Sequence, residues 1–318
     1  MTIQQVVKSS LTEYRLRKNA TRGNASQDSI CQYNFWQVNV DDMWFSRFLK
    51  YRGIQINKNI SFYSVFGNRD IIKFDKREVK IFVTGENVHF GDLNKYADNM
   101  LAEKDINLSL GFDYFEDERY MRFPLWLRTQ FAPEMTEADI ITRVRELRYP
   151  TIGNRTKFAS LVARYDWNGT RSAIYNQLQH IDKIYCPSSV LHNDDSLVTE
   201  FDDNKDAYMR QFCFNICPEN SNSYGYVTEK IFDAIYAGCI PIYWGSYNKP
   251  ESDILNHDAI IFWNKDDSNE DAIHRIEELY HDEKKMEDFL RQPRLKEGAE
   301  EIIVNYFDTL AEKMKGLL

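Results

Sequence analysis

The sequence lacks long apolar runs. Within its 318 residues, no such stretch approaches the about 20 residues that a membrane-spanning helix needs. The first residues, Met1–Lys8, also lack the apolar core of a secretory signal peptide. These two absences lead us to expect a cytoplasmic protein without a membrane anchor.

Basic residues are outnumbered by acidic ones. The chain has 40 Lys and Arg residues against 49 Asp and Glu residues, which gives a net charge of −9. A nucleic-acid-binding protein would show a basic surface stripe, so we expect no nucleic-acid partner. A local basic site for a diphosphate is still compatible with this composition. The 5 cysteines show no Cys-x-x-Cys spacing, which favours free thiols and a reducing compartment.

Several common cofactor motifs are missing. The sequence contains no Gly-x-x-x-x-Gly-Lys-Ser/Thr phosphate loop and no Gly-x-Gly-x-x-Gly dinucleotide loop. Its 6 histidines show no His-x-x-x-His zinc pattern, and there is no Asp-x-Asp pair that could hold a metal ion with a nucleotide. We therefore expect no bound metal.

Apolar segments alternate with helical patterns along the chain. Strands are expected at Ile60–Phe66, Val79–Val83 and Asn107–Phe112, and a second alternation begins at Lys157–Ala163. Such alternation is typical of parallel sheets with helical crossovers. We expect two α/β halves joined near residue 155.

Further elements follow the same logic. Residues 1–30 are polar and leave open either an irregular segment or an added helix around Leu11–Leu16. Helices are expected at 44–51, 171–181, 271–290 and 300–318, a helix and then a linker over 133–155, and strands at 209–217 and 259–263.

The most informative segment is Cys217–Gly245, which predicts a strand end, a polar loop, a helix and a short apolar strand. Its loop carries Glu219, Asn220 and Tyr226 into a helix that starts near Lys230. A helix start offers unpaired N–H groups and a partial positive charge, which suit a phosphate. The segment therefore predicts a site for a nucleotide-linked donor.

The same segment resembles a known family. Glu219–Ser221, Tyr226–Lys230, Ala237–Gly238 and Ile240–Ile242 are similar, in order and spacing, to the donor-binding signature of bacterial-type α-1,3/4-fucosyltransferases, glycosyltransferase family 10. Pro218 departs from the pattern, because the family usually has Phe before Glu-Asn.

The resemblance implies an α/β fold of GT-B architecture, in which two Rossmann-like domains face each other across a cleft. Residues 1–155 would form the acceptor-binding domain and residues 156–299 the GDP-fucose-binding domain. The terminal helix, 300–318, would return to the first domain.

A catalytic base is implied at Glu86. Phe82–Asn87 directly follows an expected strand and resembles the family's Thr-Gly-Glu-Asn segment, whose Glu is the proposed general base. A carboxylate suits the removal of a proton from an acceptor hydroxyl. The alternative is a structural carboxylate that caps a turn with Gly85 and Asn87.

Two cations are expected on the donor diphosphate, Arg171 and Lys230. By the resemblance, Arg171 begins a helix and contacts the diphosphate, where its planar fork can bind two phosphate oxygens. As a surface residue it would oppose the helix dipole unless an anion were present. Asn220 and Tyr226 are expected to donate to phosphate or sugar oxygens, and Glu229 to bind hydroxyls of the ribose or the fucose.

Structural alternatives stand beside these roles. Thr228 and Glu229 could serve as ordinary helix caps, and Asp233 could lie on a solvated helix face. For Arg119 and Arg122, in a segment that also resembles the family, a structural cluster with neighbouring acidic residues is favoured.

Acceptor binding is the least specified part of the site. Phe35 and Trp36 lie where relatives have aromatic residues near the acceptor, and aromatic rings suit the apolar faces of sugars. Most aromatic residues in this sequence context are core residues, which is the alternative.

The implied reaction is inverting transfer of L-fucose from GDP-fucose to a GlcNAc or Glc hydroxyl, with an α-1,3 linkage. The expected acceptor is a glycan of the N-acetyllactosamine type, such as a Lewis-antigen or lipopolysaccharide precursor, reached at the inner face of the membrane with at most peripheral contact. No cofactor is required, and stimulation by Mn²⁺ or Mg²⁺ stays open. The alternatives are a family member that links fucose to another acceptor position, a catalytically inactive protein that binds glycans or nucleotide sugars, and a GT-B transferase for another nucleotide sugar.

Overall fold

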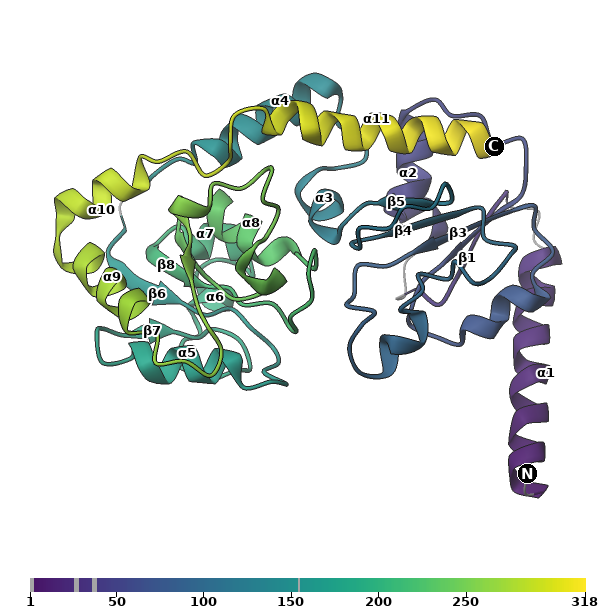
Figure 1. The fold of residues 1–318 in the computed structure, drawn as a ribbon, viewed down its shortest axis with the longest axis horizontal. Coiled ribbons are helices and arrows are strands. Elements are labelled where there is room, and N and C mark those ends of the chain that lie inside the picture. Colours follow the sequence, from purple (N-terminus) through teal and green to yellow (C-terminus); the bar gives the residue numbers. More distant parts are fainter. Residues whose placement is uncertain (1–2, 26–28, 36–38, 154) are drawn as a thin grey trace. The chain divides into compact units, whose positions relative to one another are not determined.

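A computed structural model describes residues 3–25, 29–35, 39–153 and 155–318 (Figure 1). The chain divides into two compact units. Unit 1 comprises Met1–Arg128, Ala132–Glu134 and Tyr306–Leu318, and unit 2 comprises Thr129–Phe131 and Met135–Asn305. Each unit contains one parallel β-sheet, so the α/β class and the sheets of GT-B architecture are confirmed. A cleft between the two units stays a prediction.

The sheet of unit 1 has the order β1-β2-β3-β4-β5, with every neighbouring pair parallel. Its strands are β1 (Ile30–Tyr33), β2 (Ile60–Tyr63), β3 (Val79–Val83), β4 (Leu108–Gly111) and β5 (Tyr120–Arg122). Every residue of β2, β3 and β4 is buried. A parallel sheet covered on both faces requires apolar runs without polar alternation, which is why these strands could be predicted from the sequence.

Unit 1 also contains α-helices and 3₁₀-helices. They are α1 (Ile3–Ala25), η1 (Val40–Asp42), α2 (Trp44–Tyr51), η2 (Arg69–Phe74) and η3 (Gly91–Tyr96), while α3 (Leu125–Gln130) begins in unit 1 and ends in unit 2. The predicted helix at 44–51 is confirmed as α2. Of the two alternatives for residues 1–30, the added helix is the one observed. α1 lies beside η2 and extends away from the rest of unit 1 (Figure 1).

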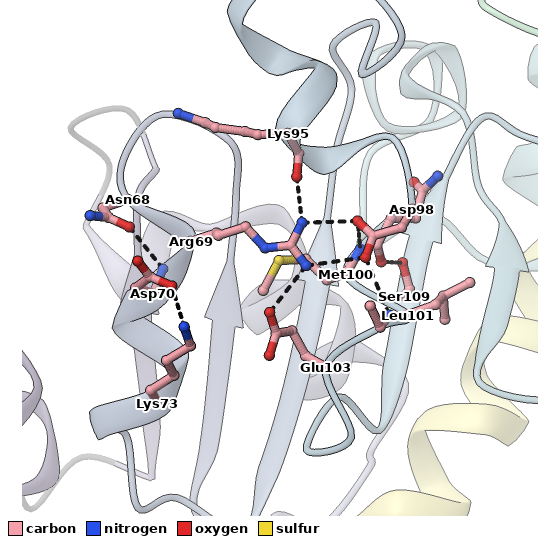
Figure 2. A network of polar contacts seen from close by, with 12 residues as sticks. Asn68, Arg69, Asp70, Lys73, Lys95, Asp98, Met100, Leu101, Glu103 and Ser109 are labelled. Carbon is pink, nitrogen blue, oxygen red and sulfur yellow. Dashed lines mark hydrogen bonds and ion pairs between the residues drawn. The ribbon is translucent and has the colours of Figure 1, made fainter.

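An ion-pair cluster in unit 1 is centred on Arg69 of η2 (Figure 2). Its guanidinium donates to both carboxylate oxygens of Asp98, at 3.0 and 3.1 Å, and to Glu103 at 3.1 Å. It also donates to the backbone oxygen of Lys95. Burial raises the pKa of Asp98, but these contacts outweigh burial and leave the pKa below its ordinary value. Four hydrogen bonds of this guanidinium thus join η2 to η3 and to the loop before β4.

The sheet of unit 2 has the order β10-β9-β8-β6-β7, and all its neighbouring pairs are parallel. Its strands are β6 (Lys157–Ser160), β7 (Ile184–Tyr185), β8 (Phe212–Ile216), β9 (Ile240–Tyr243) and β10 (Ile261–Phe262). The chain runs from β6 outward to β7, then returns to place β8 on the other side of β6. The order of the strands therefore reverses between β6 and β8.

The remaining helices follow α3 along the chain. They are α4 (Glu137–Arg148), α5 (Thr170–Leu178), α6 (Ser196–Thr199), α7 (Lys205–Met209), α8 (Glu229–Tyr236), η4 (Ser246–Asn248), η5 (His257–Ala259), α9 (Glu270–His281), α10 (Glu283–Leu290) and α11 (Ala299–Leu317). The expectation of one helix over 271–290 is wrong. Asp282 has an extended backbone and accepts a hydrogen bond from Lys285 N, so it ends α9 and begins α10.

The terminal helix α11 starts in unit 2, and its last residues belong to unit 1. There Phe307 packs against Trp44 and Phe123, with ring centroids 6.2 and 5.8 Å away. Within the described ranges, no helix combines the length and apolarity needed to cross a membrane.

Arg119 and Arg122 serve unit 1 as structural residues. Arg119 donates to the backbone oxygen of Leu101 at 2.9 Å. Arg122 donates to the backbone oxygen of Phe112 at 3.0 Å and to the hydroxyl of Tyr306 at 2.9 Å. These three contacts agree with the structural interpretation of this segment.

Candidate active site

The reversal of strand order in unit 2 marks a place for a ligand. In open α/β sheets, ligands bind beyond the carboxyl ends of the strands where the order reverses. Here these ends are those of β6 and β8, and the donor-binding segment that starts at Cys217 follows β8 directly. The helix that begins near Arg171 follows β6. The fold thus brings together two segments that lie almost 50 residues apart in the sequence.

Glu219 organises the loop after β8. Its side chain is fully buried. It accepts hydrogen bonds from the backbone N–H and the hydroxyl of Thr228, both at 2.7 Å, and from the hydroxyl of Tyr243 at 3.3 Å. Lys230 donates to it at 3.2 Å. The sequence placed Glu219 within the motif but gave it no role of its own, and only its burial identifies it as the residue that fixes the loop.

Gly245 leaves the space that Glu219 occupies. A β-carbon at this position would lie 2.6 Å from Glu219 Cγ and 2.7 Å from the hydroxyl of Tyr243. Such distances are far below van der Waals contact, so any larger residue would displace the carboxylate.

Thr228 and Lys230 form one unit with that carboxylate. Thr228 precedes α8, but its side chain makes no capping bond to the helix. Its hydroxyl instead donates to Glu219 and accepts a hydrogen bond from Lys230 Nζ at 2.8 Å. The interpretation of Thr228 as an ordinary helix cap is therefore wrong. The start of α8 is held by the protein's own carboxylate rather than left open.

Lys230 faces two carboxylates, those of Glu219 and Glu229. Lys230 Nζ also lies 3.5 Å from Glu229, whose side chain is partly exposed. Burial lowers the pKa of Lys230, but Glu219 and Glu229 outweigh burial, so its pKa lies above the ordinary value. Burial raises the pKa of Glu229, but Lys230 outweighs it, so that pKa lies below its ordinary value. Lys230 is a cation and Glu229 an anion at neutral pH.

Arg171 is buried, not a surface residue. It is 4% exposed, and its guanidinium donates to the backbone oxygens of Tyr165 and Pro218, at 2.8 and 3.0 Å. It also donates to Asn220 Oδ1 at 2.9 Å. These contacts orient Arg171 across the gap between the ends of β6 and β8.

The anion at the start of α5 is a side chain of the protein. Asp166 accepts hydrogen bonds from the backbone N–H groups of Arg171 and Ser172, at 3.0 and 2.8 Å. Burial raises the pKa of Asp166, but these bonds outweigh burial and place it below its ordinary value. The helix dipole beside Arg171 is thus already compensated, and the sequence argument that an outside anion must sit there does not hold.

Asn220 and Tyr226 lie near this cluster in different ways. Asn220 is exposed, and its backbone oxygen accepts a hydrogen bond from Asn168 at 3.0 Å. Tyr226 is 2% exposed, and its backbone N–H donates to Ser223 at 3.0 Å. The structure brings Asn220 into direct contact with Arg171, whereas Tyr226 belongs to the buried wall of the loop.

A small cavity of about 20 Å³ lies at the reversal point. Its lining combines basic side chains with the end of β8: Val162, Arg171, Lys205, Asn215, Ile216, Cys217, Pro218 and Lys230. Clustered cations at the carboxyl ends of strands make an anion-binding site. Lys205 was not predicted from the sequence, because it comes from the separate helix α7 and carries no motif.

Unit 1 presents its own polar group at the carboxyl end of β3. Thr84 and Glu86 follow the strand, and the backbone N–H of Glu86 donates to the Thr84 hydroxyl at 3.1 Å. Glu86 is half-buried. Burial lowers the pKa of Arg128 to about 10, and the charge of Glu86 acts in the opposite direction. The two charges therefore attract each other across the end of β3.

The neighbouring strand β4 ends in a second carboxylate, Asp113. It is 8% exposed, lies 2.7 Å from His89 Nε2 and accepts a hydrogen bond from Asn99 at 2.6 Å. No sequence pattern joined Asp113 to His89. The contact joins the loop after β3, which carries Glu86, to the segment after β4.

Two other expectations concern acceptor binding and metals. Phe35 is half-buried and follows β1, while Trp36 lies outside the described residues. In the part of the chain that the structure describes, no three His, Cys, Asp or Glu side chains are grouped closely enough to hold a metal ion.

Each unit contains one parallel sheet, and cations line the reversal of strand order in unit 2. This is the fold of GT-B glycosyltransferases. Two family models match this chain. The model for the α-(1,3)-fucosyltransferase FucT N-terminal domain matches residues 30–128, and the model for the glycosyltransferase family 10 (fucosyltransferase) C-terminal domain matches residues 153–297. The chain belongs to glycosyltransferase family 10, the fucosyltransferases.

Individual proteins agree with this assignment. The chain is 28% identical over 246 residues to the α-(1,3)-fucosyltransferase FucT of Helicobacter pylori. This match covers 64% of the chain, which spans about half (48%) of the length of that relative.

Solved structures show the same fold. A crystal structure of an α1,3-fucosyltransferase has a TM-score of 0.59 at 22% identity, with 89% of each chain covered. An α1,3-fucosyltransferase crystallised with GDP-fucose has a TM-score of 0.57 at 21% identity, with 92% of this chain and 95% of that chain covered.

Proposed function

We propose that this protein transfers L-fucose from GDP-fucose, with inversion, to a hydroxyl of a GlcNAc or Glc residue, forming an α-1,3 linkage. The observation that carries this proposal is the pair of oriented cations, Arg171 and Lys230, at the strand-order reversal of unit 2. The name of the H. pylori relative and the GDP-fucose complex of a structural neighbour support the choice of donor.

The cations hold the leaving group. Arg171 offers a planar fork for phosphate oxygens, and Lys230 adds a point charge beside it. As the bond between fucose C1 and the phosphate oxygen breaks, GDP keeps the electron pair, and both cations stabilise the charge that develops on the diphosphate. Two positive side chains supply what a metal supplies in other transferases, so no metal is required, and an effect of Mn²⁺ or Mg²⁺ is a matter for titration.

Glu86 acts as the general base. Its carboxylate takes the proton of the acceptor hydroxyl while the hydroxyl oxygen forms a bond to fucose C1 on the face opposite to GDP. One displacement of this kind inverts the configuration at C1. Asn220 and Tyr226 help to orient the donor, and Glu229 accepts hydrogen bonds from hydroxyls of its ribose or fucose.

For the acceptor, we propose a binding domain and two candidate contact residues. We assign acceptor binding to the N-terminal domain, residues 1–155 with the terminal helix, and donor binding to residues 156–299. Phe35 and Trp36 are the aromatic candidates for contact with a glycan of the N-acetyllactosamine type. A lipopolysaccharide or Lewis-antigen precursor, met in the cytoplasm at the inner face of the membrane, would be such an acceptor.

A nucleotide panel followed by product analysis tests this function. Calorimetry with GDP, UDP and CDP should show binding of GDP alone, and preference for another nucleotide would favour a different GT-B transferase. Incubation with GDP-fucose and N-acetyllactosamine should give a trisaccharide with the linkage to O3 of GlcNAc, identified by mass spectrometry and NMR. GDP binding without any product or donor hydrolysis would favour a catalytically inactive binding protein.

A further inference from the structure

Lys205 occupies an unusual place in unit 2. It is the first residue of α7, a short helix capped by Asn204, whose side chain accepts a hydrogen bond from the backbone N–H of Ala207 at 3.0 Å. Lys205 lines the small cavity together with Arg171 and Lys230. It also lines a second, larger cavity of about 260 Å³.

In the larger cavity the ammonium group of Lys205 has a carboxylate partner. Asp233 of α8 lies 2.8 Å from Lys205 Nζ, and its other oxygen accepts a hydrogen bond from Gln130 at 2.7 Å. Gln130 in turn accepts one from Arg143 at 3.1 Å. Asp233 is therefore not a residue of a solvated helix face, as its place in the sequence suggested. The Lys205 ammonium is thus paired with a residue that lines the larger cavity and not the small one.

The small cavity has little free volume. A volume of about 20 Å³ is close to the ~10–15 Å³ that one water needs. A diphosphate needs more room than this cavity encloses, so a phosphate group can enter it only if a side chain of the lining moves. Arg171 and Lys230 are each held by several partners. Lys205 is partly exposed and is held through one salt bridge to Asp233.

Lys205 also acts on the donor site without contact. Its positive charge is one of the influences that lower the pKa of Glu229, at the start of α8. Its electric field thus reaches the residues around the small cavity even while its ammonium group is paired with Asp233.

We propose that Lys205 is a third phosphate-binding cation of the donor site, which exchanges Asp233 for a phosphate oxygen when a nucleoside diphosphate binds. Asp233 is then an internal competitor that sets the affinity of the site. This inference rests on the proposed function, because the phosphate is that of the GDP moiety.

The exchange predicts opposite effects for the two partners. Lys205→Met removes a charge-assisted contact, so GDP should bind about tenfold more weakly. Asp233→Asn keeps an amide oxygen for Gln130 but frees the ammonium, so GDP should bind several-fold more tightly. Lys205→Arg keeps the charge and should stay within a few-fold of the unchanged protein. Lys284→Met, on the exposed side of α10, controls for the loss of one positive charge.

Calorimetric titration of GDP into the full chain, with each single variant and the double variant Lys205→Met/Asp233→Asn, tests the proposal. Asp233→Asn should raise the affinity only when Lys205 is present, and the effect should vanish in the Lys205→Met background. An equal gain in both backgrounds would mean that Asp233 merely repels phosphate, and would overturn the exchange. Lys205→Met binding as tightly as Lys284→Met would also overturn it.

Two further readouts separate the causes of failure. Circular dichroism spectra and melting curves that match the unchanged protein show that a weaker variant is folded. If the unchanged protein binds no GDP at all, the proposed function fails. If the unchanged protein binds GDP, but the Lys205 variants bind it as tightly as Lys284→Met does, the proposed function stands and this inference fails.

Discussion

Replacing Glu219 by Gln tests the central packing argument of the donor site. The substitution keeps the size of the side chain and removes its charge. One amide oxygen can still accept from Thr228 N and Tyr243, as Glu219 Oε1 does at 2.7 and 3.3 Å. The amide nitrogen, however, faces Lys230, which lies 3.2 Å from Oε2.

The cost can be worked from these contacts. Breaking a buried ion pair by removing one partner costs about 3–5 kcal/mol. Lys230 keeps Glu229 at 3.5 Å, so the loss should fall below that range. We expect the free energy of unfolding of unit 2 to fall by about 2–3 kcal/mol. GDP should bind more weakly as well, because Lys230 loses the partner that orients it.

Urea unfolding, followed by tryptophan fluorescence and circular dichroism, measures this change. Glu229→Gln is the matched control, since its carboxylate faces the same ammonium but is partly exposed, and it should cost no more than about 1 kcal/mol. Equal losses for the two variants would refute the reasoning that burial makes Glu219 the organising residue.

Three further predictions follow from the same site. Glu86→Gln should leave the affinity for GDP-fucose unchanged and lower the transfer rate by about 100-fold or more, because only the base is lost; steady-state kinetics beside calorimetry would show it, and a parallel loss of binding would contradict it. Arg171→Lys should weaken GDP binding at least about tenfold in calorimetry, since one ammonium cannot replace the fork, whereas an affinity within twofold would remove Arg171 from the site. Asp166→Asn should lower the free energy of unfolding by about 1 kcal/mol at pH 7. Because the folded pKa of Asp166 lies below its ordinary value of 3.8, this contribution is present above that pH and is lost as the pH falls through the folded pKa; a gap between variant and unchanged protein that persists at pH 2 would disprove it.

The buried strands could be predicted from sequence patterns, because burial favours apolar residues. β3 and β4 are fully buried and lie in segments rich in apolar residues. The limits of these segments mark the strands in the sequence. β5 contains Arg122 and is only three residues long, and it gave no such signal. Periodicity could not reveal the break at Asp282 either, because the apolar pattern continues across it from α9 to α10.

The candidate site shows the same division. The motif placed Arg171, Asn220 and Lys230 in the chain, and the fold brings them to one strand-order reversal. Partners outside the motif could not be predicted, since the contact of Lys205 with Asp233 spans 28 residues and depends on the packing of α7 and α8. Burial of Glu219 is likewise a tertiary property that no local pattern encodes.

Release of GDP from GDP-fucose, followed in real time with and without N-acetyllactosamine, tests the central claim most directly. The account predicts slow release from the donor alone and a marked acceleration by the acceptor, with one GDP for each fucosylated product. Release that is absent under both conditions, although GDP binds, would contradict transfer to this acceptor. Absence of both binding and release would contradict the assignment of the donor site itself.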